Sequence, residues 1–104
     1  MNELLLLGRL TADVELKETA KSEYARFTLA VDREQSDGAD FIGCVAFGNT
    51  AKALAANCSK GRQLLVKGRL QVTQNNGKSY YSVVSNRITF LQKPKEAPST
   101  EPAF

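Results

Sequence analysis

Hydrophobic and polar residues alternate along two neighbouring stretches of the chain, residues 23–33 and residues 40–48. Successive side chains of a β-strand point to opposite faces, so alternation with period two is typical of a strand with one buried face. In the first stretch, this places Phe27, Leu29 and Val31 on the inward face. Both stretches are therefore predicted to be strands, joined by a polar turn.

The second of these strands carries apolar residues on both faces. Ile42, Cys44 and Ala46 form an ordinary core face, whereas Phe41 and Phe47 point the other way with only small residues between them. A small domain has one core, so the face with the two phenylalanines is predicted to meet something outside it. The alternative is a bulge that shifts the phase of the strand and turns both rings inward.

A continuous apolar run, Glu-Leu-Leu-Leu-Leu-Gly-Arg-Leu at residues 3–10, does not alternate. Such a run is typical of a strand that is buried on both sides. In a domain of this size, one side can face the core and the other a neighbouring subunit. The residues predicted to contact that subunit are Leu4, Leu5, Leu6 and Leu7.

The middle of the chain contains the only good helical stretch, residues 49–57, which is rich in alanine. Asn49 or Thr50 can cap its beginning, and Lys60-Gly61 supplies a stop after about two turns. Before the first alternating strand, residues 12–16 have the composition of a further brief strand.

The residue pattern in the last part of the domain predicts a β-hairpin. Residues 62–74 and residues 79–91 have strand patterns, and the Asn-Gly between them is the strongest short signal for a tight turn. Gly68 lies inside the first of these strands and indicates a bulge or a sharp bend.

The order of these elements predicts the architecture. Besides the brief strand-like piece at residues 12–16, the pattern predicts five short strands, which need closure to avoid exposed edges, and Gly8 and Gly68 supply places to bend. A helix between the third and fourth strands favours an all-β fold with one short helix, a five-stranded OB-fold Greek-key barrel, over residues 1–91. Residues 92–104 contain three prolines and small polar residues, and are predicted to be a short disordered C-terminal tail.

The amino-acid composition limits the classes of function that are expected. The chain has no histidine, the commonest general base, and no residue pattern for a metal site, so we expect a protein that is not an enzyme and has neither metal nor cofactor. A formal net charge of +3 suits a polyanionic partner. Cys44 is expected to be a small buried residue. The N-terminal run is too short for a signal peptide or a membrane span, which predicts a cytoplasmic, nucleoid-associated protein without membrane contact.

Several motifs occur in the order and spacing of a known family. "LLLLGRLTADVELKET", "FTLAV", "DFIGCVAFGNTAKALA" and "LLVKGRLQV" together resemble bacterial and phage single-stranded DNA-binding proteins over residues 1–91. The resemblance implies an OB-fold in which aromatic residues at Phe41, Phe47 and Tyr80 stack on bases, with Arg69 beside them. It also implies a homotetramer, with a dimer as the alternative, that assembles through the first strand and sheet faces.

Two features depart from that family. Many members carry a further tryptophan in the loop between the last two strands, where this chain has only "TQNNGK", so contacts there are expected from Lys78 and asparagine. Cellular members end in a long tail with an acidic cluster that recruits replication and repair proteins. Here the short tail keeps the terminal Phe104 but not the acidic cluster, which argues against the usual route of recruitment and favours a phage, plasmid or paralogous version.

Binding single strands without sequence preference requires flat apolar surfaces for the bases and cations along the backbone. Tyr80 and Tyr81 are adjacent and face opposite ways, so one is expected to be packed and the other presented, with Tyr80 favoured for DNA. Tyr24 is either a stacking platform or a cross-strand partner. The residues predicted to contact DNA are Arg33, Phe41, Phe47, Lys52, Lys60, Arg62, Arg69, Lys78 and Tyr80.

The leading hypothesis is a protein that coats and protects single-stranded DNA during replication, recombination or repair. Two alternatives remain at this point. The same fold can bind RNA, because stacking and phosphate contacts do not distinguish the sugars. The chain can also be a protein-interaction module of a replication or conjugation assembly, with the phenylalanine face and Phe104 as its contact surfaces.

Overall fold

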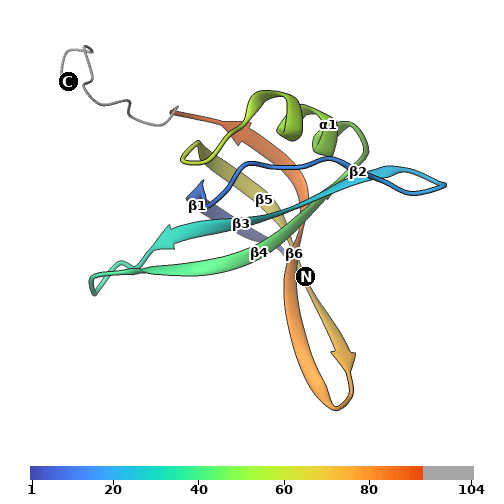
Figure 1. Ribbon diagram of the computed structural model, residues 1–104. Helices are drawn as coiled ribbons and strands as arrows, with labels where there is room; N and C mark the ends of the chain where they lie inside the picture. Colours follow the sequence, from blue (N-terminus) through green and yellow to red (C-terminus); the bar gives the residue numbers. More distant parts are fainter. Residues whose placement is uncertain (93–104) are drawn as a thin grey trace, which may run out of the picture.

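The computed structural model describes residues 1–92 and contains six strands and one helix (Figure 1). The predicted tail lies outside the described residues from residue 93 onward. The all-β class with one short helix is confirmed. The elements in chain order are β1 (Leu4–Leu10), β2 (Lys17–Glu18), β3 (Glu23–Asp32), β4 (Ala39–Phe47), α1 (Gly48–Asn57), β5 (Gln63–Asn75) and β6 (Lys78–Phe90).

The strands form one sheet in the order β1-β5-β6-β4-β3-β2, and a further pairing between β1 and β3 closes it into a barrel. Neighbouring strands are antiparallel except β4 and β6, which run parallel. Gly8 lets β1 approach β3, because a Cβ there would lie 2.5 Å from the Ala30 carbonyl oxygen. Five long strands with a helix between the third and fourth confirm the predicted OB-fold Greek-key barrel; β2 is a short addition.

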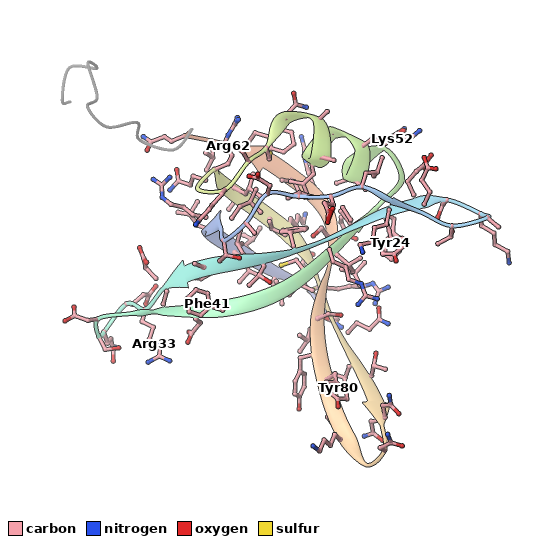
Figure 2. All side chains as sticks on the ribbon, in the orientation of Figure 1. Tyr24, Arg33, Phe41, Lys52, Arg62 and Tyr80 are labelled. Carbon is pink, nitrogen blue, oxygen red and sulfur yellow. The ribbon has the colours of Figure 1, made fainter. Side chains whose placement is uncertain are left out.

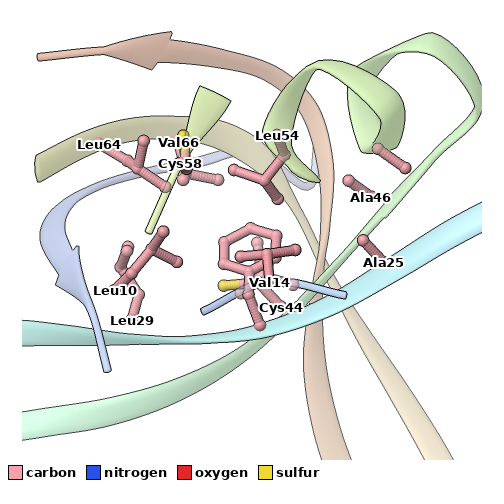
Figure 3. Packing of buried hydrophobic residues seen from close by; sticks show 13 residues of the cluster. Leu10, Val14, Ala25, Leu29, Cys44, Ala46, Leu54, Cys58, Leu64 and Val66 are labelled. Carbon is pink, nitrogen blue, oxygen red and sulfur yellow. The ribbon is translucent and has the colours of Figure 1, made fainter. Parts of the chain in front are cut away.

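The barrel interior is filled by one apolar cluster (Figure 3). Phe27 and Leu29 from β3 and Cys44 and Ala46 from β4 are all buried, which confirms the predicted phase of both strands. Leu54 is fully buried on α1, which lies over the upper end of the barrel in Figure 1. Burial raises the pKa of the Cys44 thiol to about 12, so the thiol is neutral and behaves as a small apolar residue.

The first strand is buried on one face only. Leu4 and Leu6 pack against the core, whereas the side chains of Leu5 and Leu7 are 65% and 50% exposed. The predicted burial of both faces is therefore not achieved within a single chain, and the outer face of β1 keeps two leucines in contact with solvent.

Some predicted boundaries are wrong. Residues 12–16 form no strand; they are a loop whose Val14 is buried, and the short strand β2 follows it instead. The N-cap of α1 is Phe47, without a side-chain hydrogen bond, because the chain turns at Gly48 with a φ of 60° and enters the helix before Asn49 or Thr50 can cap it. The predicted end of the helix at Asn57 is confirmed, and the buried Cys58 is its C-cap residue.

The predicted hairpin is confirmed and extends well beyond the barrel (Figure 1). Asn76 and Gly77 both have left-handed backbone conformations, with φ of 55° and 78°, as the two-residue turn requires. The register of β5 against β6 shifts between Lys67 and Gly68, at the predicted bend. Beyond this shift, residues 70–82, called the arm below, project away from the barrel. No helix within residues 1–92 is long and apolar enough to cross a membrane.

Candidate nucleic-acid interface

The outward face of β4 carries the two phenylalanines, as predicted. Phe41 and Phe47 are 71% and 50% exposed. The ladder between β3 and β4 runs without interruption from Tyr24 opposite Phe47 to Asp32 opposite Ala39. No bulge shifts the phase of the strand, so the alternative in which both rings turn inward is wrong.

A broad groove of about 1030 Å³ lies on this side of the barrel. Its lining comes from the segment after β1, the strands β3 and β4, and the arm. A Cβ added to Gly43 would meet no atom within 4 Å, so this position is an open part of the groove surface. The lining residues that bear on recognition are Tyr24, Arg26, Gly43, Phe47, Tyr80 and Tyr81.

Three of these side chains form a continuous stack. The ring centroids of Tyr24 and Phe47 are 6.5 Å apart and inclined at 42°, and the guanidinium carbon of Arg26 lies 5.8 Å from the centroid of Tyr24. The sequence analysis left Tyr24 as either a stacking platform or a cross-strand partner, and included neither it nor Arg26 among the site residues. Only the register of β3 against β4, which sets Tyr24 opposite Phe47, shows that they extend the same aromatic surface.

Both tyrosines of the arm are exposed. Tyr80 is 53% and Tyr81 65% exposed, and both line the groove. The expectation that one of them is packed is wrong, because the arm leaves the barrel and no other strand covers either of its faces. Leu70 and Val72, which lie on the same face of the arm as Tyr81, are exposed as well.

Two predicted cations lie on strands next to this surface. Arg69 is opposite Val84 on β6, and Val84 is the partner of Val45 on β4, so Arg69 shares the outward face with Val45. Lys78 begins β6, two residues before Tyr80, and points to the same side of the arm. The structure therefore places Arg69 and Lys78 on the same outward face as Val45 and Tyr80, although neither of them lines the groove itself.

Arg33 lies at the far end of the same ribbon. It follows β3 directly, beside Phe41, as Figure 2 shows. Its Nε donates a hydrogen bond of 2.9 Å to Oδ1 of Asp40. Phe41 and Phe47 are six residues apart on one strand, about 20 Å. Because Val31 pairs with Asp40 and Ala30 with Phe41, the Arg33–Asp40 pair lies on the opposite face of the hairpin from Phe41, and Arg33 is not part of the aromatic surface.

The remaining predicted cations have partners elsewhere. Lys52, on the helix, forms an ion pair of 3.3 Å with Glu23. Lys60 and Arg62 lie in the segment after α1 and do not line the groove. Arg62 donates to the carbonyl oxygens of Asn57 and Leu91 at 3.2 and 3.0 Å, so its guanidinium joins the end of the helix to the end of β6.

Among residues 1–92, no three histidine, cysteine or acidic side chains come close enough to hold a metal ion. The groove instead offers exposed rings, a guanidinium stacked on one of them and nearby cations, which suits reversible binding of flat, negatively charged partners.

The sequence profile described as the single-strand binding protein family matches residues 1–91. The chain belongs to this family. It is 41% identical to a single-stranded DNA-binding protein of Fusobacterium nucleatum over 97% of this chain and 73% of that protein. It is 51% identical to one of Clostridium perfringens over 68% of this chain and 49% of that protein.

The fold agrees with this membership. A crystal structure of a deletion mutant of the single-stranded DNA binding protein from Thermus aquaticus superposes with a TM-score of 0.77 at 26% identity. The match covers 93% of this chain and 44% of that chain. The chain thus spans about half the length of the Clostridium perfringens relative and of the Thermus aquaticus protein.

Proposed function

We propose that this chain binds single-stranded DNA without sequence preference. The observation that carries the proposal is the set of aromatic rings on the outside of the barrel: Phe41, Phe47 and Tyr80 are exposed, and the partly buried Tyr24 lies beside Phe47. Every base has a flat face, so stacking on such rings tolerates any sequence. Arg26, Arg69 and Lys78 supply positive charge beside the rings, and the names of the relatives point to the same ligand.

In this proposal the protein coats and protects exposed strands during replication, recombination or repair. It does so by binding alone, without catalysis, in the compartment that holds the DNA. Recruitment of replication or repair proteins would depend on Phe104, which lies outside the described residues.

The proposal is tested by fluorescence anisotropy with labelled oligo-dT, oligo-U of the same length and duplex DNA at several salt concentrations. We expect tight binding of oligo-dT at low salt and much weaker binding of duplex. Each phosphate contact should add about −0.7 to the slope of log affinity against log salt. Equal or tighter binding of oligo-U would favour the RNA-binding alternative, and no binding of either single strand would favour a protein-interaction module.

We also propose that the chain self-associates as a homotetramer through β1. Support comes from the exposed Leu5 and Leu7 and from the open edge of β1, whose pairing with β3 is confined to Arg9 and Leu10. An open strand edge beside apolar side chains favours pairing with another chain. A cavity of about 460 Å³ lies along this edge, between Leu5–Arg9 and Ala30–Asp32.

A Leu5→Glu/Leu7→Glu variant should lose this association, because each glutamate would have to be desolvated in the contact. Light scattering coupled to gel filtration should give four times the chain mass of 11.4 kDa for the unmodified protein and a lower mass for the variant. Leu16→Glu, at an exposed apolar residue of the loop before β2, is the control and should not change the mass. An unmodified protein that runs as a monomer would refute the association.

A further inference from the structure

Three arginines of the sheet have no ionic or hydrogen-bonding partner within residues 1–92. Arg26, Arg69 and Arg87 are exposed, and their side chains make neither an ion pair nor a hydrogen bond in this part of the chain. The other arginines of the same segment donate to carbonyl or carboxylate oxygens: Arg9, Arg33 and Arg62. A planar guanidinium without such a partner keeps its donors for a ligand, and its geometry suits phosphate.

The register of the strands places two of these arginines in one row across the outward face of the sheet. Arg26 on β3 is opposite Val45 on β4, and Val45 pairs with Val84 on β6. Val84 in turn is opposite Arg69 on β5. Neighbouring strands are about 4.8 Å apart, so three strand spacings separate the backbones at Arg26 and Arg69 by about 14 Å.

A row of aromatic rings lies directly beside this row of arginines. Tyr24 and Phe47 are opposite one another, and they are two residues along their strands from Arg26 and Val45. Two residues of a strand span about 7 Å and bring the side chain back to the same face. The guanidinium carbon of Arg26 lies 5.8 Å from the ring centroid of Tyr24, so the positive charge adjoins the stacking surface.

We propose that Arg26 and Arg69 bind two phosphates of the same DNA strand, whose backbone crosses from β4 to β6 between them. The inference rests on the proposed function and adds the course of the strand. The bases would stack on the neighbouring rings, and the two valines between the arginines carry no charge that would repel the backbone. A strand that instead followed β4 from Phe47 to Phe41 would pass Arg26 but leave Arg69 aside.

Counterion release gives the expected size of the effect. Each phosphate contact on a single strand contributes about 0.7 to the slope of log affinity against log salt. Arg26→Gln and Arg69→Gln should therefore each make the slope shallower by about 0.7, and the double variant by about 1.4. At about 50 mM salt, the loss of one such contact corresponds to a loss of about five- to tenfold in affinity.

The test is an anisotropy titration at several salt concentrations with an oligo-dT of about eight nucleotides, within the roughly 4–16 that one OB-fold binds. Arg87→Gln is the matched control: it removes the same charge from an exposed arginine of β6, but Arg87 is opposite Lys67 and lies outside the row. We expect its slope to stay that of the unmodified protein. Arg26→Lys keeps the charge and should also keep the slope.

The possible outcomes separate this inference from the proposed function. If oligo-dT of no length binds, the proposed function fails and the inference fails with it. If a longer oligo-dT binds but the short one does not, the contacts of one chain are insufficient and the inference alone is wrong. Equal changes in slope for Arg87→Gln and the two row variants would mean general charge attraction, and a change for Arg26→Gln without one for Arg69→Gln would mean that the strand does not cross; either result overturns the inference.

Discussion

Replacing Phe47 with alanine should weaken the binding of oligo-dT by about five- to a hundredfold, the equivalent of the 1–3 kcal/mol that stacking of one base contributes. Phe47 is half exposed and is the ring that links Tyr24 to the rest of the groove. The exposed ring contributes little to the core, so the melting temperature should change little. Anisotropy titration together with thermal unfolding measures both quantities.

Two further variants test this prediction: a control outside the groove and a substitution that fills the space between the two phenylalanines. Leu16→Ala removes an exposed apolar side chain outside the groove and should leave the affinity unchanged. Gly43→Val adds bulk where a Cβ meets no atom within 4 Å, so it should fold normally and still weaken binding by occupying the space between Phe41 and Phe47. Unchanged affinity in both Phe41→Ala and Phe47→Ala would refute the assignment of this face to base stacking.

Gly68→Ala should destabilise the protein by at least about 1–3 kcal/mol, the usual cost of forcing extra atoms into a packed site. A Cβ at this position would collide with the Val84 carbonyl oxygen and lie 3.0 Å from the carbonyl carbon and 3.2 Å from the Cα of Ser85. These are backbone atoms of β6, which cannot move aside as a side chain can. Urea denaturation followed by circular dichroism measures the loss.

The chain offers a matched control for this second prediction. Gly43→Ala is the same substitution in another strand, β4, but the added Cβ meets open space, so stability should be unchanged or slightly higher. Equal stability of Gly68→Ala and Gly43→Ala would show that β5 and β6 can separate at the bend without cost. The close approach at Gly68 would then not be what shapes the arm.

The parts of the fold that sequence predicted well are those governed by neighbouring residues. Alternation was enough to assign the two faces of β4, and Asn76-Gly77 was enough to place the turn, because both depend on local backbone geometry. Gly68 inside a strand pattern marked the bend for the same reason.

The parts that sequence missed depend on contacts between distant segments. The role of Tyr24 follows from its register against Phe47, which no pattern within either strand reveals. The exposure of both Tyr80 and Tyr81 follows from the direction in which the arm leaves the barrel.

The parallel pairing of β4 with β6 has a mechanical consequence. The β3–β4 ribbon is held by nine paired positions and the β5–β6 ribbon by twelve, yet the two ribbons meet directly at only two, Cys44 with Val83 and Val45 with Val84. The groove extends across these two paired positions, and residues of both ribbons line it. Few direct backbone pairs therefore fix the angle between the ribbons, and we expect a strand of DNA that lies across these positions to restrict it. If so, hydrogen exchange at the backbone amides of these paired positions should become slower when oligo-dT is added.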